Sequence, residues 1–154
     1  MTRVLKIGLG AGAAIMVGVA VVAWAFADSG TRADPGDAEQ VALGRTVYAE
    51  YCASCHGADL KGQPEWRSRQ PNGRLPAPPH DESGHTWHHP DDALFGIVKQ
   101  GLGPYAPAGY ESDMPAFGGV LNDEQIWAVL AYIKSTWPSE IQQRHATLSE
   151  QPPK

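Results

Sequence analysis

The chain has 154 residues, 42% of them hydrophobic, and a formal net charge of −5. It contains two cysteines, which excludes a disulfide-rich scaffold and any zinc site built from several cysteines. Without its first 27 residues the chain would carry ten basic and 17 acidic side chains, a balance that argues against nucleic acid as a partner. What remains suits one domain of about 100 residues with a short tail.

The chain opens with an uncharged run of 21 residues, Ile7 to Ala27, behind a basic flank. This length can span a bilayer as a helix, and the basic flank would keep the N-terminus in the cytoplasm. The small residues Ala25 and Ala27, followed by Asp28, also fit a signal-peptide cleavage site. We expect residues 1–27 to be a membrane anchor, with a signal peptide cleaved after Ala27 as the alternative. Residues 28–36 are polar and rich in turn-forming residues, which predicts a linker.

The first predicted helix runs from Ala38 to about Tyr51. Asp37, with Gln40 three residues later, is typical of a capped helix start. Directly after the helix comes Cys52-Ala53-Ser54-Cys55-His56, and C-x-x-C-H is the pattern of a c-type haem attachment site. Two thiols on one helical turn can add to the two vinyl groups of one haem, and the adjacent histidine can bind the iron. We therefore expect one covalent haem c.

Two other chemistries use C-x-x-C, namely a redox dithiol and half of a zinc site. A zinc site would need more cysteine or histidine ligands at similar spacing. A dithiol would not need the histidine and would normally begin a helix after a strand. Both alternatives are therefore disfavoured.

Residues 62–90 contain six prolines and no sustained hydrophobic periodicity, which predicts a long loop. Its apolar anchors would be Trp66, Leu75 and Trp87. Four of its side chains are candidates to bind the haem propionates: Trp66, Arg67, Arg74 and Trp87.

The same loop holds four histidines within ten residues, His80, His85, His88 and His89. Imidazoles bind copper and zinc well, and neighbouring carboxylates could complete such a site. The favoured interpretation is that these histidines hydrogen-bond loop carbonyls and haem propionates. A copper- or zinc-binding sensor, or a pH-sensitive role, remains the alternative.

Two further helices follow. Pro90 and the acidic residues after it open a helix to about Gln100, with Leu94, Ile97 and Val98 as its buried stripe. After a loop, the strongest helical pattern covers residues 123–137. Pro138 would stop that helix, and Ser139 would cap a short extra helix within a C-terminal extension, residues 138–154.

The loop before the last strong helix carries the candidate sixth ligand of the iron. Of the three methionines, Met1 and Met16 lie in the N-terminal segment, which leaves Met114, in Asp-Met-Pro-Ala-Phe-Gly-Gly. Prolines and glycines shape such a loop, and electron-transferring cytochromes place methionine opposite histidine. One of the five histidines after the motif is the alternative ligand.

The order C-x-x-C-H, Pro-rich loop, helix, Met-Pro-x-Phe-Gly and aromatic C-terminal helix resembles the monohaem class I cytochrome c family, over residues 37–137. The resemblance implies an all-α, cytochrome c-like helical domain wrapped around one covalent haem, with long Pro-rich loops. It further implies that Cys52 and Cys55 attach the haem and that His56 and Met114 are the axial ligands of the iron. Such a protein is a one-electron carrier and not an enzyme.

The resemblance also carries finer expectations. A carbonyl, of Pro78 or Pro79, should accept a hydrogen bond from His56, and Tyr132 should cross the first helix at Gly44. The location would be the periplasmic side of the bacterial inner membrane, anchored, or soluble in the periplasm after cleavage. Redox partners would include a donor such as quinol–cytochrome c reductase and an acceptor such as a terminal oxidase. A haem subunit of a larger oxidoreductase complex is the alternative.

Overall fold

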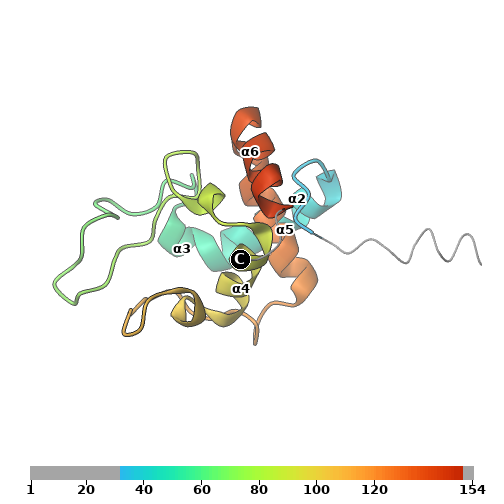
Figure 1. Ribbon diagram of the computed structural model, residues 1–154. Coiled ribbons are helices and arrows are strands. Elements are labelled where there is room, and N and C mark those ends of the chain that lie inside the picture. The colour runs from blue at the N-terminus through green and yellow to red at the C-terminus, as the bar shows by residue number, and fades with distance from the viewer. Residues whose placement is uncertain (1–31, 151–154) are drawn as a thin grey trace, which may run out of the picture. The chain divides into compact units, whose positions relative to one another are not determined.

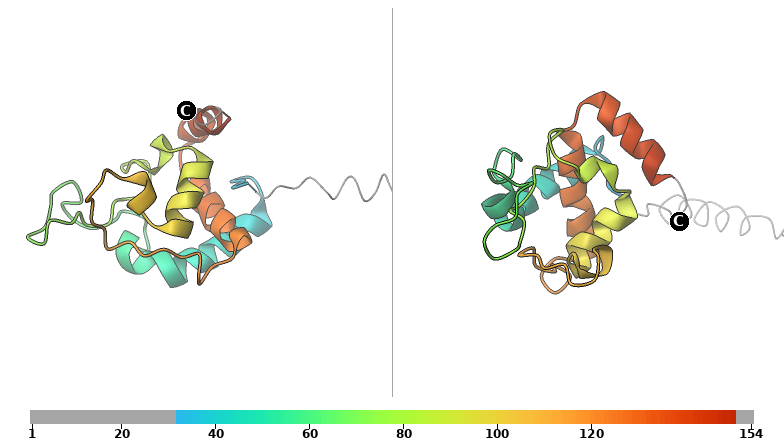
Figure 2. Two further views of the ribbon diagram at one scale, coloured as in Figure 1. Left: turned by 60° about the horizontal axis from the view of Figure 1, so that its bottom comes forward. Right: turned by 60° about the vertical axis from the view of Figure 1, so that its left-hand side comes forward.

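The computed structural model of the chain describes residues 32–150, and all regular structure in that range is helical (Figures 1 and 2). This confirms the expected all-α class. The expected anchor or signal peptide, and the first part of the expected linker, lie outside the described residues. Within residues 32–150, no helix is long and apolar enough to cross a membrane. The longer helices are α2 (Ala38–Val47), α4 (Asp91–Gln100), α5 (Asp123–Ser135) and α6 (Ser139–Ser149).

The first helix continues further than the sequence predicted, and its geometry changes on the way. After α2 comes a π-helical turn, η1 (Tyr48–Cys52), and then a short α-helix, α3 (Ala53–His56). Asp37 caps the start, because its side chain accepts hydrogen bonds from the backbone N–H groups of Glu39 and Gln40. A π turn holds one residue more than an α turn. Cys55 and His56 are therefore shifted around the helix axis by about one residue position from where an unbroken α-helix would place them.

The helices α2 and α5 form the central packing pair of the domain, and they cross at Gly44. A Cβ atom at this position would lie 1.9 Å from the carbonyl oxygen of Ala128 and 2.9 Å from the Cβ of Tyr132. Only glycine allows two helix backbones to approach this closely. The rings of Tyr48 and Tyr132 pack beside the crossing, with centroids 5.4 Å apart. The predicted crossing of Tyr132 over Gly44 is confirmed.

The core lies mainly along α5, whose start is closed by a reciprocal pair of hydrogen bonds between Asn122 and Gln125. The helix ends two residues before Trp137, where the prediction had placed its end. Helix α4 begins after Pro90, which acts as its cap rather than as its first residue. The buried side chains that fill the core come from α2, η1, α4 and α5 and from the residues that flank α5: Val47, Tyr48, Leu94, Leu121, Ile126, Val129, Leu130, Ile133 and Trp137.

A buried ion pair ties Ala33, in the segment predicted as a linker, to this core. The Nζ atom of Lys134 lies 2.9 Å from both carboxylate oxygens of Asp91 and 2.7 Å from the carbonyl oxygen of Ala33. The two charged side chains are only 9% and 6% exposed, and Ala33 is buried as well. At this residue the predicted linker therefore packs against the domain.

Helix α6 fastens the histidine-rich loop to the domain through His145. This side chain is fully buried, and its Nε2 donates a hydrogen bond of 2.9 Å to the carbonyl oxygen of His89. The hydroxyl of Ser149 accepts a second bond, of 3.1 Å, from the backbone N–H of Asp91. The predicted extra helix is present, but Ser139 does not cap it, because Pro138 is the cap and no side chain bonds there.

Candidate functional site

The cysteine motif lies where η1 passes into α3. Cys52 is half-buried at the end of η1, Cys55 is exposed in α3, and both are free. Burial raises the pKa of the Cys52 thiol to about 11, and the nearby Cys55 adds to this. A reactive dithiol or a zinc ligand needs an easily formed thiolate and therefore a lowered pKa. The Cys52 thiol is thus poorly suited to redox or zinc chemistry, whereas a neutral thioether bond suits its half-buried position.

His56 ends α3, and the surrounding chain holds its ring in one orientation. The ring is buried, and its Nδ1 donates a hydrogen bond of 2.8 Å to the carbonyl oxygen of Pro78. The sequence had left Pro78 and Pro79 as the two candidates for this bond, and it is formed by Pro78. Because Nδ1 carries the proton, Nε2 is left with the free lone pair that a metal requires. Burial lowers the pKa of His56, against the smaller raising effect of the Pro78 bond, and so favours the neutral, metal-binding form.

The loop that carries Pro78 passes close behind this histidine. The backbone N–H of Gly62 donates a bond of 2.8 Å to the carbonyl oxygen of His56. Gly62 has a φ of +67°, and a Cβ there would lie 2.6 Å from the carbonyl carbon of Pro78. Tyr48 holds the end of α3 from the other side, because its hydroxyl donates to the carbonyl oxygen of Gly57 at 2.9 Å. Glycine at position 62 therefore lets the Pro78 carbonyl reach the imidazole.

Three of the four clustered histidines stack on different rings. His80 stacks on His56, with ring centroids 4.0 Å apart, while His85 stacks on Trp66 and His88 on Trp87. The fourth, His89, packs edge to face against His85, with centroids 5.6 Å apart. Among the described residues, no group of three or more histidine, cysteine, aspartate or glutamate side chains is placed to hold a metal ion. The proposal of a copper or zinc site therefore gains no support from this part of the chain.

The donors to the loop carbonyls are mostly not the clustered histidines that the sequence suggested. Trp87 Nε1 donates to the carbonyl oxygen of Glu82 at 3.3 Å, and Trp137 Nε1 donates to that of His80 at 2.7 Å. Outside the cluster, His145 supplies the third such bond, to His89. The sequence did not predict this contact, because His145 and His89 are 56 positions apart along the chain.

Met114 lies half-buried in the loop between α4 and α5, and this loop is fastened on two sides. On one side, the backbone N–H groups of Phe117 and Gly118 donate to the last turn of α4, at 2.9 and 3.0 Å. On the other side, Arg74 of the long loop forms ion pairs with Glu111 and Asp113. The residue next to Met114 is thus tied to the loop that carries Pro78.

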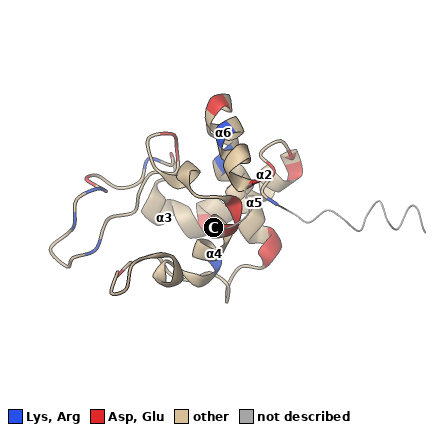
Figure 3. Cartoon of the chain, viewed as in Figure 1, with Lys and Arg blue, Asp and Glu red and all other residues tan. Residues whose placement is uncertain are grey.

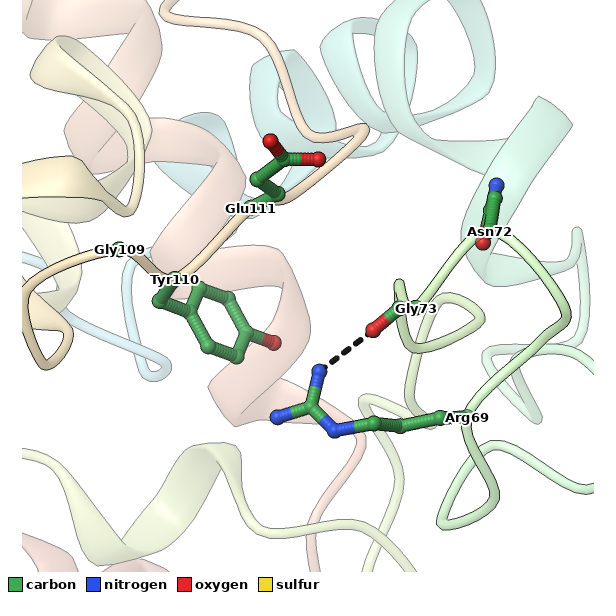
Figure 4. A pocket seen from close by; sticks show the side chains of 6 residues that line it. All are labelled: Arg69, Asn72, Gly73, Gly109, Tyr110 and Glu111. Atoms are coloured by element: carbon green, nitrogen blue, oxygen red, sulfur yellow. Dashed lines mark hydrogen bonds between the residues drawn. The ribbon is translucent and has the colours of Figure 1, made fainter.

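The expected propionate-binding side chains have protein partners in the structure. Arg67 lies over the ring of Trp66, with its guanidinium carbon 4.0 Å from the ring centroid. Near Arg74, the two long loops enclose an open, polar pocket of about 340 Å³ (Figure 4). In this pocket, the Arg69 guanidinium donates a hydrogen bond of 2.5 Å to the carbonyl oxygen of Gly73. Its guanidinium carbon lies 5.7 Å from the centroid of the Tyr110 ring. Sequence reasoning missed both Arg69 and Tyr110.

Charge is unevenly distributed over the described residues. Between Lys61 and Arg74 the chain carries four basic residues and one acidic residue, although the whole chain is acidic. In Figure 3 these basic residues lie along the loop that extends beside α3, while acidic residues occur both on the helices and on the loops. The sequence does not mark this segment as a basic patch, because its basic residues are scattered through a Pro-rich segment without periodicity.

Comparison with known proteins gives two matches. Residues 41–137 match the Cytochrome c family. The curated protein Cytochrome c-555 of Prosthecochloris aestuarii is 33% identical over 109 residues, which cover 63% of this chain and 90% of that protein. No solved structure matches the chain significantly.

Proposed function

The chain belongs to the cytochrome c family of haem-based electron carriers, which bind haem c covalently, and we propose that Cys52 and Cys55 hold its haem while His56 and Met114 bind the iron. When bound, the haem supplies an iron that takes up and releases one electron. The protein supplies the attachment, the ligands and a surrounding that excludes water.

The observation that carries this proposal is the geometry of His56. Its ring is buried, its Nδ1 is bonded to the Pro78 carbonyl, and its Nε2 is free for iron. A hydrogen bond at the second ring nitrogen is the usual arrangement for a metal-bound histidine, because it fixes the tautomer and the direction of the ring. The two cysteines lie on the turn just before it, so one haem can be held by all three residues.

Met114 is proposed as the second ligand because the loop that carries it is fixed at both ends. If Met114 stayed bound in both oxidation states, the ligand set would not change with each electron. With His56 and Met114 both bound, the iron would offer no position to oxygen or a substrate, so we propose an electron carrier rather than an enzyme. Methionine opposite histidine also raises the reduction potential.

The proposed location is the periplasmic side of the bacterial inner membrane, with residues 1–27 as the anchor. The support for it is the apolar run Ile7 to Ala27 behind a basic flank. Redox proteins are the expected partners, with a quinol–cytochrome c reductase as donor and a terminal oxidase as acceptor. The alternative is that the chain transfers electrons as the haem subunit of a larger oxidoreductase complex.

The covalent attachment is tested by extraction. Acid–acetone should leave the haem on the purified protein, because two thioether bonds hold it. A Cys55→Ala variant should keep it by one bond at most, with lower haem content per chain. Complete extraction of the haem from the unmodified protein would overturn the assignment of Cys52 and Cys55.

The sixth ligand is tested by replacing Met114 with alanine. We expect the sulfur-to-iron charge-transfer band of the oxidised protein to disappear, the reduction potential to fall, and cyanide or carbon monoxide to bind. Gly119→Ala is a matched control in the same loop, because a Cβ there would meet no atom within 4 Å. If the band survives in Met114→Ala, another side chain supplies the ligand.

A further inference from the structure

A single hydrogen bond does not fully hold the plane of the His56 ring. The bond from Nδ1 to the Pro78 carbonyl, 2.8 Å long, fixes the direction in which the N–H points. Small changes in the side-chain torsions still allow the ring plane to tilt. A contact with the face of the ring limits this tilt, so a residue that packs against the face helps to set the orientation of the plane.

His80 makes that contact. Its ring lies face to face with the ring of His56, with centroids 4.0 Å apart and planes inclined by 25°. The edge of Tyr48 packs near His80 in turn, with ring centroids 6.2 Å apart and planes at 73°. The stack therefore continues from His56 through His80 into the core of the domain.

His80 is itself held by three hydrogen bonds from three parts of the chain. Its ring Nδ1 is bonded to the hydroxyl of Thr86 at 2.8 Å. Its backbone N–H donates to the carbonyl oxygen of Leu60, and its own carbonyl accepts from Trp137 Nε1, both at 2.7 Å. A ring held in this way can serve as a fixed surface for a neighbouring ring.

The other histidines of the loop have no such relation to His56. His88 is the closest analogue, because it also stacks on an aromatic ring, that of Trp87, with centroids 3.7 Å apart and planes inclined by 26°. The stack of His88 and Trp87 lies beside α6, where the guanidinium carbon of Arg144 lies over the Trp87 ring, 5.2 Å from its centroid. His88 thus offers a matched control from the same loop with the same type of contact.

We propose that His80 is a positioning residue for the iron ligand: by stacking on His56, and held by Thr86, it sets the orientation of the His56 imidazole plane relative to the haem. This rests on the proposed ligation of iron by His56. The orientation of an axial imidazole determines how unpaired electron density is distributed over the ferric porphyrin, and contacts beyond the ligands themselves are known to tune metal centres. His80 therefore belongs to the electron-transfer site and not to a second metal site.

The test uses the full-length haem protein in three forms that remove different parts of the arrangement. His80→Leu removes the ring stack on His56. His80→Phe keeps a flat ring but loses the hydrogen bond to Thr86. Thr86→Val keeps the His80 imidazole but removes the hydrogen bond that holds it. The readout is the pattern of haem methyl resonances in the proton NMR spectrum of the ferric protein, together with the reduction potential. Both report on the haem itself and not on the stability of the fold.

We expect His80→Leu to change the order and spread of the four haem methyl resonances and to shift the potential. Thr86→Val should change them in the same direction but less, and His80→Phe should restore part of the original pattern. His88→Leu should leave pattern and potential unchanged, even if it lowers the melting temperature. Thr86→Val and His80→Phe change the size and shape of the side chain little and should not prevent folding. The test can therefore be made with these two variants even if His80→Leu does not fold.

The proposal is overturned if His80→Leu and Thr86→Val both give the pattern and potential of the unmodified protein. It is equally overturned if His88→Leu shifts the potential as much as His80→Leu, because the effect would then be general to the loop. Failure of the proposed ligation would look different: the unmodified ferric protein would lack the shifted resonances of an axial histidine, and both proposals would fall together.

Discussion

His145 shows how a single buried side chain can make the fold sensitive to pH. Its ring is fully buried, Nε2 donates to the His89 carbonyl, and Nδ1 has no hydrogen-bond partner among the described residues. Protonation would place an N–H group at Nδ1 with nothing to accept its bond. Burial therefore lowers the pKa of His145; Asp91, 3.9 Å away, raises it, and Lys134 lowers it further.

We expect the stability contributed by His145 to depend on pH in a defined direction. Its pKa in the folded protein is below the usual 6.5. The unfolded chain therefore binds more protons in this range, and the contribution is complete above pH 6.5 and is lost as the pH falls through the folded pKa. Chemical denaturation of the unmodified protein and of His145→Gln, from pH 8 to pH 5, measures it.

At pH 8 the glutamine variant should be less stable by about 1 kcal/mol, the typical value of one hydrogen bond. The difference should shrink towards pH 5. His85 and His89, whose pKa values burial also lowers, are present in both proteins and cancel in the comparison. A difference that stays constant over this range would show that His145 does not titrate as described.

At the scale of single residues, the sequence was informative where partners are close along the chain. Cys52, Cys55 and His56 form one local pattern, and this pattern was enough to predict the cofactor. The stack of His80 on His56 and the pair of Lys134 with Asp91 join residues 24 and 43 positions apart. Asp91 looked like an ordinary acidic residue in the first turn of a helix, and no pattern distinguished its buried role.

At the scale of helices, the crossing of α2 and α5 makes a sharp prediction for Gly44. In a helix interior, alanine normally raises the stability by about 1 kcal/mol relative to glycine. Here the added Cβ would meet the Ala128 carbonyl oxygen at 1.9 Å, and this oxygen belongs to a helix backbone that cannot turn aside. We expect Gly44→Ala to destabilise the protein by about 1–3 kcal/mol, since the two helices must separate.

Thermal unfolding of Gly44→Ala and of Gly103→Ala measures this effect. A Cβ at Gly103 would have no atom within 4 Å, so that variant should behave like the unmodified protein. If Gly44→Ala were as stable as the unmodified protein, the helices would have to be further apart than described.

Helix positions were largely predictable, and the errors have physical causes. Capping residues and apolar spacing predicted α4 and α5 to within two residues, because these helices bury one continuous stripe. The π turn at Tyr48–Cys52 was not predicted, since no residue type marks it. The cap of α6 was assigned to Ser139 because serine is a common cap, whereas Pro138 is the cap and Ser139 is the first residue of the helix.

At the scale of the whole molecule, the fate of residues 1–27 decides where the electron carrier works. We expect the anchor to remain, because the apolar run of 21 residues is longer than the usual core of a signal peptide. N-terminal sequencing of the mature protein, after washing the membranes with salt, decides the matter. A chain that begins at Asp28 and is found in the soluble fraction would show that the segment is a removed signal.

The domain also depends on contacts that no single element supplies. Lys134 of α5 joins Asp91 of α4 to Ala33, in the segment predicted as a linker, and His145 of α6 holds the histidine-rich loop. Composition and periodicity predicted the longer helices but not this network, because polar residues in a core cannot be told from surface ones by spacing. The loops around His56 are thus supported from both ends of the domain.

The π turn between α2 and α3 fixes the angular phase of the haem-binding motif. Neighbouring residues of an α-helix are about 100° apart around its axis. If the five residues Tyr48–Cys52 were wound as a regular α-helix, with none removed, the cysteines and His56 would turn by about this angle relative to the face that packs on α5. Helix content would hardly change, yet the imidazole would point away from the Pro78 carbonyl. The winding of this short turn, and not its helical character alone, therefore sets the direction in which the haem-binding residues leave the helix.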